Sequence, residues 1–185
     1  DVRLKRWRLK QLRVKEDFDF ESVDILDRPA LDQLLGSVRP VAIINLAARA
    51  GVRQSVQDPW IYIETNVTGT LNLLDLCIKH GIKKFIQAST SSLYGVQDQP
   101  FNEALSTGRP LSPYAASKKA SEALCHSYHH LHGLDISVLR YFTVYGPAGR
   151  PDMSLMRFTK WIFENEPVRI FGDGKQSRDF TFVDD

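Results

Sequence analysis

Hydrophobic and polar positions divide the chain into strand-like and helix-like segments that alternate. Residues 41–48 (VAIINLAA) form a continuous apolar run, and residues 83–90 (KKFIQAST) and 135–146 (DISVLRYFTVYG) follow as further strand-like segments. Continuous apolar runs are typical of strands that are buried on both faces, as in parallel sheets. Shorter segments at residues 18–25 (FDFESVDI) and 168–172 (VRIFG) predict two more strands.

Helix-like segments lie between these strands. Residues 58–81 begin with Asp-Pro and end on glycine, and residues 113–133 begin with proline and end on glycine. These are common start and stop signals of helices. Residues 152–166 (DMSLMRFTKWIFENE) also predict a helix. Residues 3–15 (RLKRWRLKQLRVK) are strongly basic and predict a solvated amphipathic helix, with a nucleic-acid-binding arm as the alternative.

The alternation of strands and helices with short connections indicates βαβ units and an α/β fold with a parallel, doubly wound sheet. In such a sheet the ligand lies beyond the carboxyl ends of the strands. Three segments follow predicted strands: residues 45–51 (NLAARAG), 89–95 (STSSLYG) and 143–152 (TVYGPAGRPD). We therefore expect the functional residues to lie in these three segments and on the helices beside them.

Composition narrows the class of protein. A chain of 185 residues can bury a sizeable core, and 43% hydrophobic with 25% charged residues is typical of a soluble globular protein. The net charge of +2 gives no argument for nucleic acid, and no apolar run is long enough to span a bilayer. Cys77 and Cys125 lie apart, so we expect buried thiols in a reducing, cytoplasmic compartment, without a disulfide or a metal site.

The segment SPYAASKKA, residues 112–120, carries the candidate chemistry. Tyr114 and Lys118 are four residues apart, so on a helix they share one face. A free phenol is a poor base at neutral pH, and a nearby ammonium group favours the phenolate. This spacing also occurs by chance on helix surfaces. Thr90 at the end of a predicted strand completes a set that could oxidise an alcohol by general-base catalysis.

Seven motifs, in this order, resemble the extended short-chain dehydrogenase/reductase family and its nucleotide-sugar epimerases. They are VDILD, NLAARAGVRQSV, NVTGTLNLLD, FIQASTSSLYG, SPYAASKKASE, LRYFTVYGPAGRPDM and FGDGKQSRDFTFVDD, and they cover nearly the whole chain. RYFTVYGPAGRPDM and the Thr-Ser-Ser after the central strand are most similar to the UDP-glucuronate 4-epimerase subgroup.

The resemblance implies a Rossmann-like sheet with NAD as cofactor and a UDP-sugar as substrate. It implies that residues 1–146 are a partial NAD-binding domain and that residues 147–185 begin the sugar-nucleotide-binding region. The family's Gly-rich phosphate loop, G-x-x-G-x-x-G after the first strand, is missing from the chain. We therefore expect a fold truncated at the N-terminus and within the C-terminal substrate-binding region.

The family pattern assigns roles by position. Thr90, Tyr114 and Lys118 are the catalytic candidates, and the last two also face the cofactor. Ordinary structural roles remain open for Asp24, Asn66 and Tyr141, and solvation remains open for the arginines. Asn45 stands where the subgroup more often has His, and Arg53 is a weaker candidate for the anionic region. The other cofactor-binding candidates are Asp24, Ile25, Leu46, Ala47, Ala48, Asn66 and Tyr141; the substrate-binding candidates are Ser91, Ser92, Thr143, Arg150 and Arg178.

The residues after Thr90 favour one reaction. Related 4,6-dehydratases have Asp-Glu there and UDP-glucuronate decarboxylases have Thr-Ser-Glu, whereas this chain has two serines. The absence of a carboxylate favours 4-epimerisation, with UDP-glucuronate and UDP-galacturonate as the pair. The alternatives are a UDP-glucose 4-epimerase, a decarboxylase, a 4,6-dehydratase or a non-catalytic NAD(P)-binding regulatory protein. The resemblance also implies a homodimer formed through the helices near residues 59–80 and 113–132.

Overall fold

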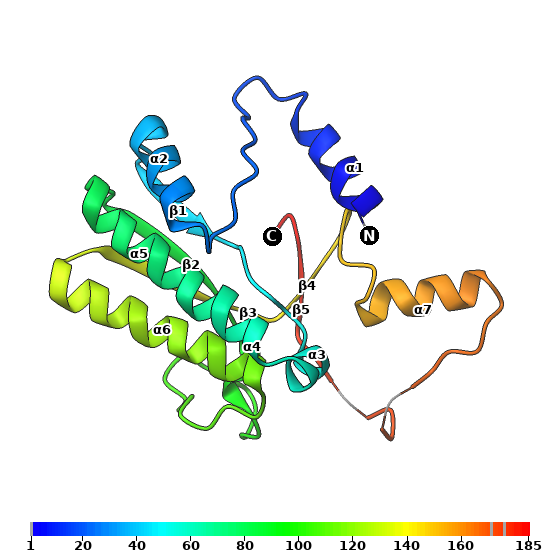
Figure 1. Cartoon of the computed structure of the whole chain (residues 1–185). Helices are drawn as coiled ribbons and strands as arrows, with labels where there is room; N and C mark the ends of the chain where they lie inside the picture. Colours follow the sequence, from blue (N-terminus) through cyan, green and yellow to red (C-terminus); the bar gives the residue numbers. More distant parts are fainter. Residues whose placement is uncertain (1, 171, 176) are drawn as a thin grey trace. The chain divides into compact units, whose positions relative to one another are not determined.

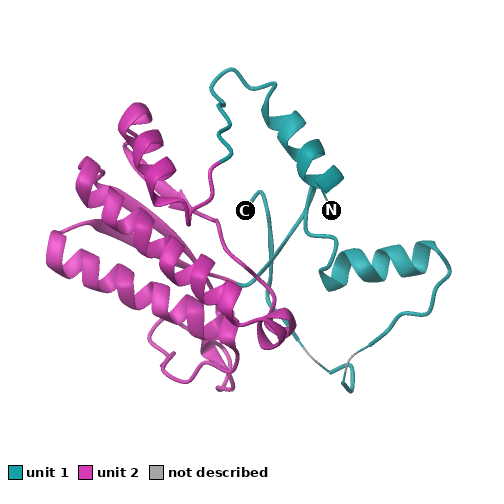
Figure 2. Ribbon diagram, in the orientation of Figure 1, with its two compact units in different colours: residues 1–22, 142–185 teal, residues 23–141 magenta. Residues whose placement is uncertain are grey.

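The computed structural model describes residues 2–170, 172–175 and 177–185 (Figure 1). The chain divides into two compact units, which are coloured separately in Figure 2. The larger unit comprises residues 23–141, and the smaller unit comprises residues 1–22 and 142–185. The predicted boundary after residue 146 concerns domains of the whole family fold, and it stays a prediction.

The larger unit contains a parallel sheet of three strands in the order β1-β2-β3. These strands are β1 (Ala42–Asn45), β2 (Lys84–Thr90) and β3 (Asp135–Tyr141). The register places Ile43 opposite Phe85 and Thr90 opposite Tyr141. The predicted α/β fold with a parallel sheet is therefore confirmed, and the carboxyl ends of β2 and β3 lie at the same edge.

Most helix boundaries follow from the capping residues. Ser112 accepts a hydrogen bond from the Ala115 amide at 3.1 Å at the start of α6, and Gly133 with φ of 65° ends that helix. Gly81 with φ of 67° ends α5. The helix predicted over 58–81 consists of three consecutive pieces, one of them a π-helix. The helical elements of this unit are α2 (Arg28–Val38), α3 (Val52–Gln57), α4 (Trp60–Tyr62), the π-helix η1 (Ile63–Thr68), α5 (Gly69–His80), the 3₁₀ helix η2 (Ser91–Tyr94) and α6 (Pro113–His132).

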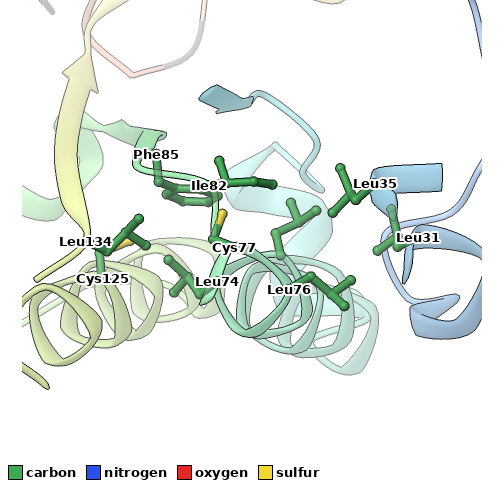
Figure 3. Close-up of a cluster of buried hydrophobic side chains, with 10 residues drawn as sticks. Leu31, Leu35, Leu74, Leu76, Cys77, Ile82, Phe85, Cys125 and Leu134 are labelled. Carbon is green, nitrogen blue, oxygen red and sulfur yellow. The ribbon is translucent and has the colours of Figure 1, made fainter. Parts of the chain in front are cut away.

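The hydrophobic core lies where α5 and α6 pack against one face of the sheet (Figure 3). Phe85 of β2 and Leu74 of α5 are fully buried there, and α2 contributes Leu31 at its edge. Cys77 and Cys125 are buried in the same cluster as free thiols, as predicted. Burial raises the pKa of both thiols to about 12, so neither is a reactive thiolate at neutral pH.

The prediction that the strands within residues 41–48 and 135–146 are buried on both faces is wrong. Ile44 of β1 is 61% exposed and Leu139 of β3 is 40% exposed. Both point to the face opposite Phe85, because side chains alternate along a strand and the register aligns Ile44 with Ile86. Helices α5 and α6 cover the other face, so an apolar run alone does not ensure burial.

The smaller unit contains α1 (Val2–Leu12), β4 (Thr143–Tyr145), α7 (Ser154–Phe163) and β5 (Phe180–Phe182). Strands β4 and β5 pair in parallel. Helix α1 confirms the predicted basic helix and has no buried residue. No helix in the described part of the chain combines the length and apolar character needed to cross a membrane.

Three strand predictions need correction. The segment 135–146 is two strands in separate sheets, because the chain leaves β2 at Tyr141 and pairs with β5 from Thr143. Residues 18–25 and the described residues 168–170 form no strand, since no described strand pairs with them. Phe171 lies outside the described residues. Strand β5 was missed because a polar loop precedes it.

Candidate active site

Thr90 ends β2 and begins the 3₁₀ helix η2, where the backbone changes from an extended conformation to a tight turn. Thr90 is 7% exposed, and its Oγ1 accepts a hydrogen bond from the Ser92 amide at 3.2 Å. Ser91 and Ser92 follow and are half-buried. The structure therefore brings these three predicted hydroxyl residues together in one turn at the carboxyl end of the central strand.

Tyr114 and Lys118 lie in the first two turns of α6. Lys118 is 4% exposed, and its Nζ donates a hydrogen bond to the Ala88 carbonyl at 2.8 Å. Ala88 is two residues before Thr90, so the ammonium group lies beneath the strand end that carries the threonine. Tyr114 is half-buried, and its ring meets that of Tyr62 edge-on with 6.2 Å between the ring centroids.

Burial determines the protonation of Lys118. Loss of water around the ammonium group lowers the pKa of Lys118 to about 8. The group therefore still carries its charge at neutral pH, but at a cost to folding. An ammonium group has three donors, and among the described residues Lys118 makes one hydrogen bond, to Ala88. The remaining donors could bind the hydroxyl groups of a ligand.

Asn66 lies in the π-helix and is 1% exposed. Its side chain accepts a hydrogen bond from the Arg49 amide at 2.8 Å and donates to the Arg49 carbonyl at 3.0 Å. It also donates to Ser117 Oγ at 2.9 Å, and Ser117 donates to the Tyr114 carbonyl at 2.8 Å. Asn66 thus joins the segment after β1 to the helix that carries Tyr114, and both of its amide hydrogens are already used. Its predicted contact with the cofactor stays a prediction.

The segment after β1 carries three cofactor-binding candidates. Leu46 is 66% exposed, Ala47 is exposed and Ala48 is half-buried, so their backbone is open to a ligand. Asn45 is 3% exposed and anchors the start of the segment. Its side chain donates to Gln87 Oε1 at 2.9 Å and accepts from the Ala47 amide at 3.2 Å. The asparagine found in place of histidine therefore fixes the strand end.

The other cofactor-binding candidates differ in their surroundings. Asp24 is exposed, and its carboxylate accepts a hydrogen bond from the Leu26 amide at 2.9 Å in a turn. Ile25 packs against the core, close to Gly69 at the start of α5, where an added Cβ would lie 2.4 Å from Ile25 Cδ1. Tyr141 is 42% exposed, so it is not a core aromatic residue.

The substrate-binding candidates of the smaller unit are only partly brought together. Thr143 and Arg150 line one pocket with a volume of about 170 Å³, which Met153 and Met156 also line. Arg150 Nε donates to Asp152 Oδ1 at 3.0 Å, and this contact lowers the pKa of Asp152. Arg178 is exposed and donates to the Ser177 carbonyl at 2.7 Å. It is not among the residues that line the pocket.

A largely buried ion pair in the larger unit was not predicted from the sequence. Arg140 of β3 donates to both carboxylate oxygens of Glu122 of α6, at 3.0 and 2.9 Å. Glu122 is 8% exposed and also accepts a hydrogen bond from Ser89, the residue before Thr90. The available signal was Arg140 inside the apolar run SVLRYF, since buried charges are nearly always paired. No group of three or more His, Cys, Asp and Glu residues in the described ranges is arranged to hold a metal ion.

Comparisons with known proteins agree with this geometry. The model of the NAD dependent epimerase/dehydratase family matches residues 3–185. A UDP-glucuronate 4-epimerase from Thermodesulfobacterium geofontis is 58% identical over 185 residues, which are all of this chain and 57% of that protein. The chain thus spans about half the length of the relatives that it matches.

Solved structures match equally well. The crystal structure of UDP-glucuronic acid 4-epimerase from Bacillus cereus, in complex with UDP-glucuronic acid and NAD, has a TM-score of 0.91 and 42% identity. The match covers 99% of this chain and 57% of that one. A dTDP-glucose 4,6-dehydratase from Streptomyces venezuelae, with NAD bound, has a TM-score of 0.90 and 30% identity over 97% of this chain and 55% of its own.

Proposed function

The chain belongs to the NAD dependent epimerase/dehydratase family, and on this premise we propose that it forms part of a UDP-glucuronate 4-epimerase. Such an enzyme interconverts UDP-glucuronate and UDP-galacturonate. The observation that carries the proposal is the turn Thr90-Ser91-Ser92 above the buried Lys118. It presents hydroxyl groups and no carboxylate at the strand end, so it would not repel a sugar acid and offers no additional acid for eliminating water.

The residues present fit NAD. The buried ammonium group of Lys118 has donors to spare for ribose hydroxyls, and the exposed backbone of residues 46–48 allows close approach. Asp24, Ile25 and Tyr141 complete the proposed set. When bound, NAD supplies a reversible acceptor for the hydride of the sugar C4. The 185 residues contain no G-x-x-G-x-x-G, so we propose no residue of this chain as the phosphate-binding loop.

In the proposed mechanism, Tyr114 as phenolate takes the proton of the sugar 4-hydroxyl. Thr90 holds that hydroxyl by a hydrogen bond, and the positive charge of Lys118 favours the phenolate. A 4-keto sugar results and turns over in the site, after which Tyr114 returns the proton to the new hydroxyl. Ser91 and Ser92 donate hydrogen bonds to the sugar carboxylate. The 4-keto intermediate is a β-keto acid, which would readily lose carbon dioxide. These contacts protect it by holding the acid group in place.

Thr143, Arg150 and Arg178 are proposed to bind the sugar nucleotide. An arginine binds a phosphate or carboxylate through two parallel hydrogen bonds. Arg150 already makes this type of contact with Asp152, so a bound anion would replace the carboxylate of Asp152. Both groups of this pair are about half exposed, at 45% and 54%, so the exchange would cost little.

The test is the conversion of UDP-glucuronate by the full-length protein, with the products separated by chromatography. We expect UDP-galacturonate, and we expect Tyr114→Phe to lower kcat by about 100-fold or more, because it removes the general base. Tyr128→Phe on the same helix is the control and should retain activity. Release of a UDP-pentose or of a 4-keto-6-deoxy sugar would contradict the proposal. Conversion of UDP-glucose in preference to UDP-glucuronate would favour the alternative epimerase.

We also propose that the full-length protein is a homodimer formed through α5 and α6. The exposed sides of these helices carry Leu71 and Ile78, at 38% and 37% exposure, and Leu131 at 70%. A sedimentation experiment on the full-length protein should give twice the monomer mass. Leu131→Glu should shift the equilibrium toward monomers, whereas a wild-type protein that sediments as a monomer at micromolar concentration would refute the dimer.

A further inference from the structure

The ion pair of Glu122 and Arg140 lies between α6 and β3 of the larger unit and takes no part in the proposed chemistry. The two side chains meet as parallel forks, Nε to Oε1 at 3.0 Å and Nη2 to Oε2 at 2.9 Å. Their side chains are 8% and 20% exposed. This two-fold geometry fixes both distance and orientation, so the pair sets the position of β3 relative to α6.

Further contacts tie the pair to neighbouring elements. Ser89 Oγ donates to Glu122 Oε1 at 2.6 Å, which links the pair to β2. Arg140 Nη1 donates to the Tyr94 hydroxyl at 3.4 Å, and the Arg140 guanidinium lies 5.4 Å from the centre of the Tyr94 ring. The same Nη1 donates to the Glu103 carbonyl at 3.3 Å. One guanidinium thus contacts α6, η2 and the loop that follows η2.

Each of these contacts lies beside a residue with a proposed role. Ser89 precedes Thr90, and Arg140 precedes Tyr141. Glu122 is one turn beyond Lys118 on the same face of α6, and Tyr94 closes the turn that begins with Ser91. The ion pair therefore contacts Ser89 and Tyr94 at the two ends of the Thr90-Ser91-Ser92 turn, without reaching the reactive groups themselves.

Stability alone does not account for this arrangement. Taking two charges out of water costs about as much as their attraction returns, and well-packed apolar residues often replace a buried pair without loss of stability. The hydrogen bonds at Glu122 are directional, however. They fix Ser89 and Arg140, which an apolar contact would leave free to shift. A shift of about 1 Å at a reacting group can cost about 100-fold in rate.

We propose that Glu122 and Arg140 are positioning residues, which hold the Thr90-Ser91-Ser92 turn and the loop 95–112 in register with Tyr114 and Lys118. The proposal rests on the proposed function for its kinetic consequences. The pair touches neither substrate nor cofactor in this role. It fixes the distance between the strand end that carries Thr90 and the helix that carries the base.

The decisive variant replaces both charges by apolar side chains of similar size, Glu122→Leu with Arg140→Met, in the full-length protein. We expect Tm to stay near that of the wild type, the KM for UDP-glucuronate to change by less than about threefold, and kcat to fall by about tenfold or more. Wild-type kcat in this folded variant would overturn the proposal. Activity is expressed per folded enzyme, so a fall of kcat that only follows a loss of folded protein counts as wild-type kcat.

A milder variant keeps the test decisive where the double replacement does not fold. Ser89→Ala removes the link to Thr90 and leaves the ion pair in place; Ser127→Ala, on the exposed side of α6, is its matched control. We expect Ser89→Ala to retain its Tm and lose about fivefold or more in kcat, and the control to lose nothing. Equal kcat in the two variants would overturn the proposal.

Hydrogen exchange separates this inference from the proposed function. In the double replacement of Glu122 and Arg140 and in Ser89→Ala, the amides of residues 91–112 should exchange faster, whereas those of α5 should not change. This result is expected even where the wild-type protein fails to convert UDP-glucuronate, in which case the proposed function is wrong and the positioning role stands. Unchanged exchange in residues 91–112 would refute the positioning role, whatever the activity.

Discussion

The two units of the chain differ in whether their apolar residues are buried. Every described residue that is buried lies between positions 31 and 134, within the larger unit. The smaller unit has none, although α7 carries Phe158, Trp161 and Phe163, the last of which is 87% exposed. An amphipathic pattern thus predicts a helix in both units, but burial requires a second apolar surface that closes over it.

The same difference separates the candidate site residues. Thr90 and Lys118 lie in the larger unit, where strand ends and a capped helix fix them before any ligand arrives. Arg150 and Arg178 lie in the smaller unit on exposed backbone and contact their own sequence neighbours. The proposed catalytic groups thus lie on rigid elements, whereas the residues proposed to contact the nucleotide can adjust. Four experiments test this contrast.

The largest effect is expected for a matched pair of phenylalanines. Phe85 is fully buried in β2, so Phe85→Ala should lower the free energy of unfolding by about 3 to 5 kcal/mol. Phe163→Ala in α7 should change it by less than about 0.5 kcal/mol. Urea titrations followed by circular dichroism would measure both. Similar losses for the two variants would mean that Phe163 is buried in solution and would break the comparison.

Two ion pairs provide the next test. Burial opposes the charge of Glu122, but hydrogen bonds from Arg140 and Ser89 outweigh this effect and keep the pKa of Glu122 below its ordinary value. Its contribution to stability is therefore present above the ordinary glutamate pKa of about 4.3 and is lost as pH falls through the lower folded value. Glu122→Gln should cost about 3 kcal/mol at pH 7 and flatten this acid limb.

Asp152 is the control for Glu122. Its pKa is also lowered, by Arg150, but its side chain is 54% exposed and solvent screens the pair. Asp152→Asn should therefore cost less than about 1 kcal/mol at pH 7. Chemical denaturation between pH 3 and 7 measures both variants. If the two substitutions changed the pH dependence of the free energy of unfolding equally, the exposure of an ion pair would not determine its contribution to stability.

Lys118 should oppose stability, and its removal should reveal the cost. Because burial lowers the pKa of Lys118 to about 8, Lys118 binds more protons in the unfolded chain between pH 8 and about 10.4, so its contribution to stability should rise over this range, while the two buried thiols act in the opposite direction. Lys118→Met should increase the free energy of unfolding at pH 7 by about 1 to 3 kcal/mol and remove this rise. Lys160→Met, at an exposed position of α7, should change neither; a difference in stability between the wild type and Lys118→Met that stays constant from pH 8 to about 10 would contradict the burial effect.

The smallest effect on stability is expected at the exposed arginine of the smaller unit. Arg178→Ala should leave the free energy of unfolding within about 0.5 kcal/mol of the wild type. In the full-length protein it should raise the KM for UDP-glucuronate by about tenfold, since it removes a charged hydrogen-bond donor from the proposed nucleotide site. Steady-state kinetics would measure this, and Arg169→Ala is the matched control. An unchanged KM would remove Arg178 from the proposed site.

The sequence predicted what local signals encode. Pro113 and Gly133 mark α6 because proline suits a first turn and glycine tolerates a left-handed end, and the spacing of Tyr114 and Lys118 then follows. The strand predicted at residues 18–25 was wrong because a strand also needs a partner. The burial of Glu122 against Arg140 was missed for the same reason, since its partners are distant in sequence. Arg140 within SVLRYF was the one visible hint.

The π-helix at residues 63–68 has a consequence for how this chain can change in length. The carbonyl of Asn66 accepts the hydroxyls of Thr70 and Ser121, and the next residues run directly into α5. A deletion of one residue within this turn would restore ordinary helical winding and leave α5 close to its present phase, because a π-turn accommodates one extra residue in an α-helix. The side chains within the turn would change direction instead, Asn66 among them. A deletion here should therefore break the contacts of Asn66 rather than the core packing of α5.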